Sequence, residues 1–234
     1  MSKLPQSLSY HIFTDRWQDH QEAVALYERV YDCWHTIWSQ TFREIKGLEH
    51  LFSDEFDRQD EVTAIFEGNR VIGVFCYGWH NFQLRSHLNH SYFKAYPPET
   101  LAQLKELGAH LVMSMGNLAV VPEWRKVNNG IIADGLIGLG CKRFLSSDCD
   151  HLIAYTRNDR KVNQLCYGHG AKCLKSGYSQ HNVEVDIIAI DRKTAVLGKT
   201  AEVSQFVENL WERRVVHGER TVGRFESATF PKAA

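Results

Sequence analysis

The sequence lacks the features that mark several large classes of protein. Its 27 lysine and arginine residues are scattered without a basic run, and 28 acidic residues balance them to a net charge of −1. Nothing in this balance requires a nucleic acid or an anionic membrane as partner. The chain also shows no internal repeat and no low-complexity tract. We therefore expect a folded protein that does not bind a polymeric anion.

Cysteine pairs and long apolar runs are missing as well. The six cysteines show neither a C-x-x-C pair nor the spacing of a zinc site, and several lie in apolar runs where a free thiol behaves as a small hydrophobic group. The first residues lack a charged segment followed by an apolar one, and Asp134 breaks the most apolar later stretch. We expect reduced cysteines, no signal peptide, no membrane span and a cytoplasmic protein.

Two patterns that suggest cofactors do not hold. The glycines of GLIGLG (135–140) stand in the wrong order for a dinucleotide motif and lie within a predicted helix, so close helix packing explains them better. His80, His87 and His90 match no standard zinc spacing, and we expect no metal. No G-x-S-x-G elbow or Cys-His signature is present, so the sequence gives hydrolase chemistry little support.

The 44% hydrophobic content is enough for a core, and the apolar spacing predicts an α+β fold. Gly68-Asn69 joins two apolar runs within 62–79 and predicts a hairpin. A helix, the hairpin, then strand, helix, strand, helix, strand indicates one mixed sheet flanked by helices around a parallel βαβ core. The expected strands are 8–14, the two within 62–79, 110–121, 151–156 and 182–190, and the expected helices are 22–46, 97–107, 130–145 and 159–167.

The stretch 22–46 carries an aromatic stripe at steps of three or four, which predicts one helix or two helices that share the stripe. The stripe packs against the sheet, lines a substrate pocket through Tyr31, Trp34 and Trp38, or does both. Residues 80–98, rich in histidine and aromatic residues, look like an insertion or lid.

The chain after residue 198 ends in an amphipathic segment and a polar tail. We assign 1–198 to the main domain and 199–234 to a C-terminal helix and tail, packed on that domain or forming a homodimer contact. The apolar face of the segment consists of Val203, Phe206, Val207, Leu210, Trp211 and Val215.

The segment VVPEWRKVNNGII (120–132) combines the end of an apolar strand, a short polar loop and the start of an apolar helix. A strand that leads directly into a helix in this way exposes the first backbone N–H groups of the helix and the positive end of its dipole. This arrangement suits a phosphate or another anion. The loop is therefore a candidate anion site.

Val120-x-Pro122-x-x-Arg125-x-x-Asn128-x-Gly130 resembles the acyl-CoA loop of the GNAT superfamily of N-acyltransferases, V-x-P-x-x-R-x-x-G-x-G. The order of elements from about residue 8 to 190 is also similar, and so is the NDRKVNQLCYGHGAK stretch. One position departs from the family pattern. Asn128 replaces a glycine, so that position either adopts an uncommon backbone region or alters the approach of a pyrophosphate.

The resemblance implies an acyl-CoA or acyl-phosphopantetheine donor. It places the phosphates at Arg125, Lys126, Asn128, Asn129, Gly130 and Ile131. It also implies that the pantetheine arm pairs with the strand at Asn117, Leu118, Ala119 and Val120, where a backbone N–H polarises the thioester carbonyl. The leaving thiolate would be protonated by Tyr167, or by Cys166 if Gly170-Ala171 sets the register.

No single residue stands out as the base that takes the proton of the amine. Glu123, His110 and Ser114 lie on or beside the long strand 110–121, and relay through water is a further option. We interpret the chain as an N-acyltransferase that acts on the primary amine of a small molecule.

Two alternatives stay open at this point. The acidic residues ahead of the hairpin in 51–75 are similar to acyl-homoserine-lactone synthases and N-acyl amino acid synthases, whose donor is an acyl carrier protein. The arginine usual in those families after the hairpin is replaced by Cys76 and Tyr77. The second alternative is a non-catalytic module that binds acyl thioesters.

Overall fold

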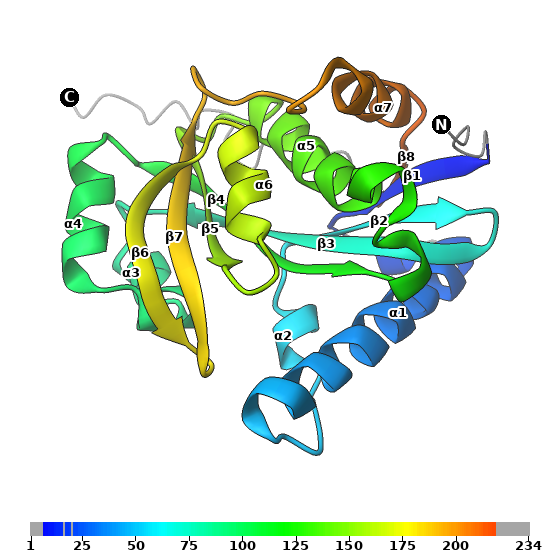
Figure 1. Ribbon diagram of the computed structural model, residues 1–234, viewed down its shortest axis with the longest axis horizontal. Coiled ribbons are helices and arrows are strands. Elements are labelled where there is room, and N and C mark those ends of the chain that lie inside the picture. Colours follow the sequence, from blue (N-terminus) through cyan, green and yellow to red (C-terminus); the bar gives the residue numbers. More distant parts are fainter. Residues whose placement is uncertain (1–6, 16, 20, 219–234) are drawn as a thin grey trace, which may run out of the picture.

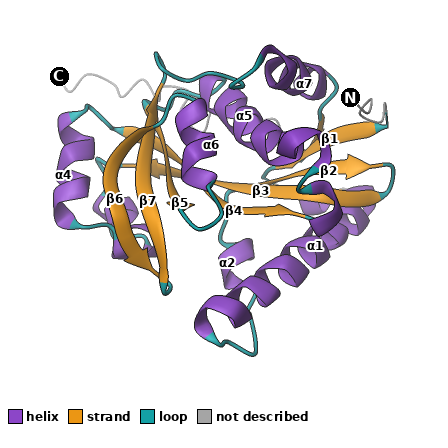
Figure 2. Ribbon diagram, in the orientation of Figure 1, coloured by secondary structure: helices purple, strands orange, loops and turns teal. Residues whose placement is uncertain are grey.

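The computed structural model describes residues 7–15, 17–19 and 21–218. The eight strands in these residues form one mixed sheet. Its strand order is β6-β7-β5-β4-β3-β2-β1-β8 (Figures 1 and 2). Strand β1 pairs in parallel with β8, and β4 pairs in parallel with β5, while the other neighbours are antiparallel. The strands are β1 (Leu8–Phe13), β2 (Glu61–Glu67), β3 (Arg70–Asn81), β4 (Leu111–Val120), β5 (His151–Arg157), β6 (Lys172–Gln180), β7 (Val183–Asp191) and β8 (Val215–His217).

Helices cover both faces of the sheet. Figure 1 shows α5, α6 and α7 on one side and α1 and α2 on the other. The α-helices are α1 (Gln21–Lys46), α2 (Asp54–Asp57), α3 (Arg85–Leu88), α4 (Pro98–Glu106), α5 (Ile131–Leu145), α6 (Val162–Gly168) and α7 (Ala201–Glu212). Short 3-10 turns are η1 (Trp17–Asp19), η2 (Ser91–Ala95), η3 (Pro122–Trp124) and η4 (Val127–Gly130). None of the helices in the described residues has the length and apolar character needed to cross a bilayer.

Successive side chains along β5 and β7 point to opposite faces of the sheet, so the hydrophobic core has a part on each face. Leu152 and Ile188 point to the α5 side, whereas Ile153 and Ile187, one residue along each strand, pack with Phe93 and Leu104 on the opposite side. Both faces of the strands are thus apolar, as expected for strands that helices cover on each side.

The stripe in 22–46 forms one helix rather than two. No glycine or proline interrupts Gln21–Lys46, and Gly47 ends it in a left-handed conformation (φ 66°) with its N–H bonded to the Arg43 carbonyl at 3.0 Å. Trp34 and Phe42 are buried against the sheet. The helix therefore packs along β3 and β4, with Trp38 partly buried beside them.

The glycines of GLIGLG serve close packing, as predicted. A Cβ on Gly138 would lie 2.1 Å from the Leu197 carbonyl oxygen, and one on Gly135 would lie 2.4 Å from the Phe206 ring. Helix α7 packs here against α5 with Val203, Phe206, Val207 and Leu210 buried. Val215 belongs to β8 and is 41% exposed, so its predicted place on the apolar face of this helix was wrong. The tail 219–234 lies outside the described residues.

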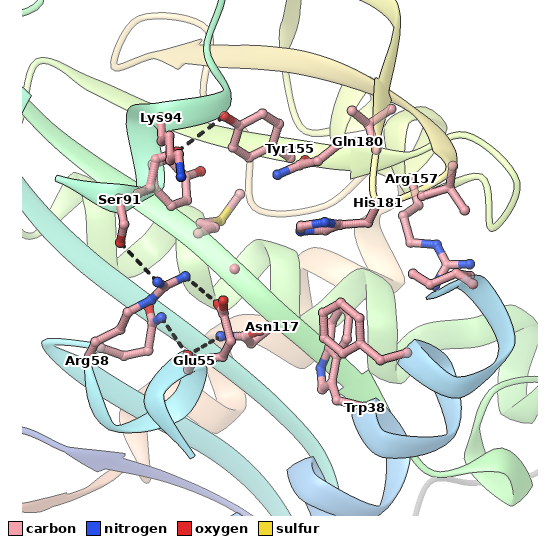
Figure 3. Close-up of a pocket in the computed structure, with 18 residues that line it drawn as sticks. Trp38, Glu55, Arg58, Ser91, Lys94, Asn117, Tyr155, Arg157, Gln180 and His181 are labelled. Atoms are coloured by element: carbon pink, nitrogen blue, oxygen red, sulfur yellow. Dashed lines mark hydrogen bonds and ion pairs between the residues drawn. The ribbon is translucent and has the colours of Figure 1, made fainter. Parts of the chain in front are cut away.

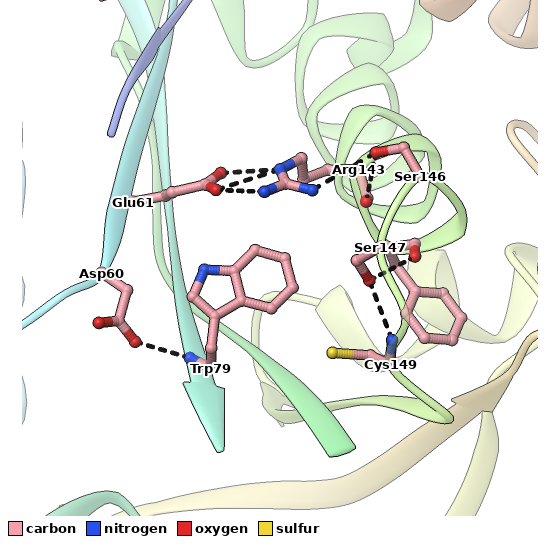
Figure 4. Close-up of polar contacts among 8 residues, drawn as sticks. Asp60, Glu61, Trp79, Arg143, Ser146, Ser147 and Cys149 are labelled. Atoms are coloured by element: carbon pink, nitrogen blue, oxygen red, sulfur yellow. Dashed lines mark hydrogen bonds and ion pairs between the residues drawn. The ribbon is translucent and has the colours of Figure 1, made fainter. Parts of the chain in front are cut away.

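A buried ion pair fixes the other end of α5 to the sheet. Arg143 donates from Nε and Nη2 to the carboxylate of Glu61 on β2, with the shortest contact at 2.5 Å. Its guanidinium also lies 4.6 Å from the centre of the Trp79 ring (Figure 4). Because both charges are almost fully buried, removing either partner alone would leave an uncompensated charge in the core. Helix α5 is thus held firmly against β2 and β3.

Candidate active site

The sheet opens between β4 and β5. These parallel strands pair only from Val112 to Met115 on β4 and from His151 to Ala154 on β5. Beyond those positions each strand continues, β4 to Val120 and β5 to Arg157, without pairing to the other. The backbone of the two strand ends therefore borders a gap that passes through the sheet.

A bulge in β4 lies at the edge of this gap. Cys76 on β3 pairs with Gly116 and Val74 with Ala119, so two residues of β4 face one of β3. The bulged residue Asn117 has φ 60°, a left-handed conformation that asparagine tolerates better than most residues. Its Nδ2 donates to the Glu55 carbonyl at 2.9 Å, which ties α2 to the bulge.

One pocket, which we name the α5 pocket, occupies the gap on the side of α5 and α6. It has a volume of about 500 Å³. Its lining comes from α1, from the end of β4, from the loop before α5 and from the turn between β5 and α6. These residues are Ile37, Trp38, Gln40, Thr41, Glu44, Leu118, Val120, Arg125, Asn129, Gly130, Ala133, Arg157, Arg160, Lys161, Val162, Gln164 and Leu165. Its polar rim is rich in cationic side chains.

The loop before α5 has an unusual backbone. Asn128 (φ 43°), Asn129 (φ 58°) and Gly130 (φ 81°) are left-handed in succession. Asn128 thus adopts the uncommon region itself. The Arg125 Nε donates to the Val120 carbonyl at 2.9 Å, so part of its guanidinium closes the loop while the side chain lines the pocket. The Ile131 N–H, which the sequence predicted to face a phosphate, donates to the Val127 carbonyl.

A second pocket, the α2 pocket, lies on the opposite side of the sheet, with a volume of about 520 Å³ (Figure 3). Its walls are largely aromatic and aliphatic, with a few charged groups. They comprise Trp38, Phe42, Ile45, Glu55, Arg58, Gln59, Ser91, Tyr92, Lys94, Met115, Gly116, Asn117, Tyr155, Arg157, Gln180, His181, Val183 and Val185. Arg58 forms an ion pair with Glu55 and donates to Ser91 Oγ at 3.0 Å, which bridges α2 and η2.

Trp38 of α1 and Arg157 of β5 line both pockets, so the two pockets meet between them. The indole N–H of Trp38 is buried and has no hydrogen-bond partner among the described residues. We name the region between these two side chains the waist.

His181 is the imidazole in the lining of these two pockets. It occupies the turn between β6 and β7 with φ 54°, and its ring contacts Phe42 at 5.7 Å between centroids. Burial, followed by the nearby Lys46 charge, lowers the pKa of His181. This shift favours the neutral form of the ring, whose unprotonated nitrogen is a proton acceptor.

Several predicted site residues line these pockets, and others lie elsewhere. Those in the lining are Trp38, Asn117, Leu118, Val120, Arg125, Asn129 and Gly130. Tyr31 and the fully buried Trp34 pack with Phe56 in the core beneath α1, which is the structural alternative given for the aromatic stripe. Ala119 and Ile131, the first residue of α5, are also buried in the core. Lys126 and Asn128 lie outside the linings of both pockets.

The candidate bases from the sequence lie away from the gap. Glu123 is exposed and pairs with Arg70 at 2.9 Å. His110 is exposed at the opposite end of β4. Ser114 is buried, with its hydroxyl 3.0 Å from His80 Nε2. None of the three lines either pocket.

The candidate acids on α6 are not part of the lining of either pocket. Tyr167 donates its hydroxyl to Asp186 at 2.5 Å, and burial together with this carboxylate raises the tyrosine pKa. Cys166 is 1% exposed in the core, where burial raises the pKa of its thiol to about 12. This geometry therefore gives no support to a leaving-group acid on α6.

Sequence reasoning missed the residues that the fold brings to the gap from distant segments. Arg157 ends β5, and Arg160 and Lys161 follow it. The carboxyl end of a parallel strand next to a switch in strand order is a common ligand site, so these residues could have been found. Glu55, Arg58 and His181 gave no comparable signal. Among the described residues, no cluster of three or more His, Cys, Asp or Glu side chains could hold a metal ion.

Comparison with known proteins shows the fold. No family model matches the sequence, and no curated protein matches it. The chain is similar in structure to a CoA-dependent acyl-homoserine lactone synthase, BjaI, solved with SAM and isopentyl-CoA, at a TM-score of 0.57 and 13% identity over 91% of this chain and 95% of that one.

Two further structures cover the chain almost as fully. The acyl-homoserine lactone synthase LasI matches at a TM-score of 0.53 and 12% identity, over 91% of this chain and 98% of that one. FeeM, an N-acyl amino acid synthase from uncultured soil microbes, matches at 0.51 and 13%, over 85% of this chain and 97% of that one. The predicted fold, a GNAT-like mixed sheet flanked by helices, is therefore confirmed, with a likeness to these synthases.

Proposed function

We propose that this chain transfers an acyl group from an acyl-CoA thioester to the primary amine of a small molecule. The observation that carries the proposal is the gap between β4 and β5, with a cationic pocket on one side of the sheet and a mostly apolar pocket on the other. A long, thin donor with a phosphate end and an acyl end fits a passage with this polarity.

The donor's phosphates would bind in the α5 pocket. Arg125, Arg160 and Lys161 line it beside the start of the 15-residue helix α5, so side-chain charge and the helix dipole both favour an anion there. The pantetheine arm would then extend along β4, where Asn117 and Leu118 are missing from the pairing with either neighbouring strand. Such an edge can accept an added extended chain.

The thioester would lie at the waist and the acyl chain or the acceptor in the α2 pocket. The backbone N–H groups of the bulge are the donors that would face the carbonyl oxygen, whose negative charge grows as the amine attacks. The amine nitrogen forms a bond to the carbonyl carbon, the carbon–sulfur bond breaks, and the amine proton leaves. We assign that proton to the neutral His181 or to water beside it.

A specific feature favours a second candidate, a carrier-protein-dependent N-acyl amino acid synthase. The α2 pocket offers aromatic and aliphatic walls with Arg58 and Lys94 among them, which suits a long acyl chain or a carboxylate-bearing amine. The three synthases above share the fold over nearly the whole chain. In this case an acyl carrier protein is the donor and partner.

Thiol release tests the proposal. Acetyl-, octanoyl- and palmitoyl-CoA and octanoyl acyl carrier protein are each offered with a pool of primary amines, including amino acids, and N-acyl products are identified by mass. Release that depends on the amine supports the transferase, and release from the carrier protein alone moves the synthase ahead. Donor binding without turnover in any combination would contradict both and leave a binding module.

The His181→Asn variant tests the role of the imidazole. Asparagine tolerates the left-handed backbone of this turn, so the fold should persist. We expect kcat to fall by about 10²-fold, the lower end of general-base contributions. Unchanged kcat with the same pH profile would show that water alone takes the proton.

A further inference from the structure

The described pockets lack the acid that the reaction is expected to need at the leaving sulfur. The Tyr167 hydroxyl is bonded to Asp186, and the Cys166 thiol is enclosed in the core. The carbon–sulfur bond of a thioester can break without an acid, but the sulfur then leaves with a negative charge. A cation beside the sulfur would favour this step by stabilising that charge.

Arg157 is the cation at the waist. It is the last residue of β5, beside the unpaired end of β4, and it lines both pockets. The other cationic residues of the linings belong to one pocket each: Arg125, Arg160 and Lys161 to the α5 pocket and Arg58 and Lys94 to the α2 pocket. A thioester that spans the waist must pass Arg157.

The guanidinium of Arg157 is held in a fixed orientation. Its Nε and Nη2 donate to the two carboxylate oxygens of Asp159 at 3.0 and 2.6 Å, and its side chain is 16% exposed. This bond from Arg157 is the main reason that the Asp159 pKa is lowered, so the carboxylate stays ionised. A bidentate pair of this kind fixes the plane of the guanidinium and leaves Nη1 without a bond to Asp159.

We propose that Arg157 stabilises the leaving thiolate of the acyl donor as an ion pair, so that no acid is needed at the sulfur during bond cleavage. This inference rests on the proposed acyl transfer. The amine nitrogen bonds to the carbonyl carbon, and the electron pair of the broken carbon–sulfur bond goes to sulfur, opposite the guanidinium. The amine proton goes to His181 or water, and the thiolate takes a proton from solvent after release.

Asp159 is a positioning residue in this account. It holds Arg157, and one of its carboxylate oxygens also lies 3.7 Å from Arg160 Nε, while Arg160 Nη2 lies 3.5 Å from a carboxylate oxygen of Glu44. The bidentate contact fixes the orientation of the Arg157 guanidinium at the waist. Without Asp159, Arg157 keeps its charge but loses its fixed direction.

The test varies the acidity of the leaving thiol. The same acyl chain is presented as acyl-CoA and as an S-acyl thiophenol, whose thiolate needs less stabilisation. S-acyl pantetheine, which has the same leaving thiol as acyl-CoA without its phosphates, is the control for donor binding. With acyl-CoA we expect Arg157→Gln to lower kcat by about 10² to 10³-fold, the scale of one lost electrostatic donor. The loss in kcat/KM, relative to wild type, should become several-fold smaller with the thiophenol ester.

Two variants keep the test decisive if Arg157→Gln does not fold. Arg157→Lys retains the charge without the bidentate geometry and should recover part of kcat. Asp159→Asn should lower kcat while changing KM for acyl-CoA by less than about three-fold. An equal loss for the alkyl and the aryl thioesters would overturn the thiolate role. Absence of turnover in the wild type with every donor would instead overturn the proposed acyl transfer.

Discussion

Left-handed residues other than glycine concentrate around the passage through the sheet. Asn117 and His181 line the α2 pocket, and Asn129 and Lys161 line the α5 pocket. Asn128 and Asn182, the remaining described residues of this kind, are their sequence neighbours. Such conformations cost energy and persist where the surrounding structure holds them, and they gather at binding sites. The left-handed backbone conformations and the two pockets thus occur in the same region of the structure.

The hydrogen bonds around Asp186 lower the pKa of its carboxyl group and stabilise the fold. It accepts hydrogen bonds from Tyr167 at 2.5 Å, Asn163 at 2.9 Å and Asn158 and the Gly177 N–H at 3.0 Å. Burial acts to raise its pKa, but these donors outweigh burial and lower the pKa to about 2. The charged carboxylate thus stabilises the junction of α6, β6 and β7.

Replacing Asp186 by Asn should lower the free energy of unfolding by on the order of 2 kcal/mol at pH 7. Because the pKa is lower in the folded state, this contribution is fully present above about pH 4, where the unfolded carboxyl titrates, and is lost as the pH falls toward 2. Urea unfolding of wild type and variant at pH 7, 4 and 3 measures it. The exposed Asp148→Asn is the control, and a difference that is undiminished at pH 3 would refute the assignment.

At the scale of elements, the sequence predicted those with strong periodicity or clear end signals. The helix at 22–46, the hairpin at Gly68-Asn69 and the order of β4, α5 and β5 all follow from local patterns. Strand β6 was missed because KCLKSGYSQ alternates weakly: it is an edge strand with two register shifts and mostly exposed side chains. Helix α6 begins at Val162, three residues later than predicted, after the left-handed Lys161.

The residues of the candidate site also differ in how well the sequence predicts them. The loop at 120–130 could be recognised because its residues are contiguous and their spacing carries the signal. Arg157, His181 and Glu55 become neighbours only through the packing of β5, the β6–β7 turn and α2, which no local pattern specifies. The same limit applies to Tyr167, since the spacing on α6 does not show which way the side chain points.

The contact between α5 and α7 gives an element-scale prediction. Gly135→Ala places a Cβ 2.4 Å from Phe206 Cε1, so the variant should lose about 1–3 kcal/mol of stability even though alanine favours helix. Adding Phe206→Leu should relieve the clash, making the double variant more stable than the two single losses predict by more than about 0.5 kcal/mol. Denaturant unfolding of all four proteins gives the coupling, and simple additivity would show that the helices do not meet here.

At the scale of the whole molecule, the order of the strands creates the site. The sheet is continuous from β8 to β4 and from β5 to β6, and the two halves are joined only by the four-residue pairing of β4 with β5. Helices α1 and α5 lie on opposite faces beside this junction and supply the walls of the passage. The fold thus brings a cationic end, a waist and an apolar end into line.

The central claim is that this passage binds a phosphopantetheine donor with its phosphates at the loop before α5. Calorimetric titration of CoA into wild type, Arg125→Ala and Lys105→Ala tests it most directly, since Lys105 is an exposed lysine on α4 outside both pockets. We predict that CoA binds, that Arg125→Ala weakens binding by about 1–3 kcal/mol through loss of a charge-assisted contact, and that Lys105→Ala has no effect. Failure of CoA to bind, or equal affinity in Arg125→Ala, would contradict the account.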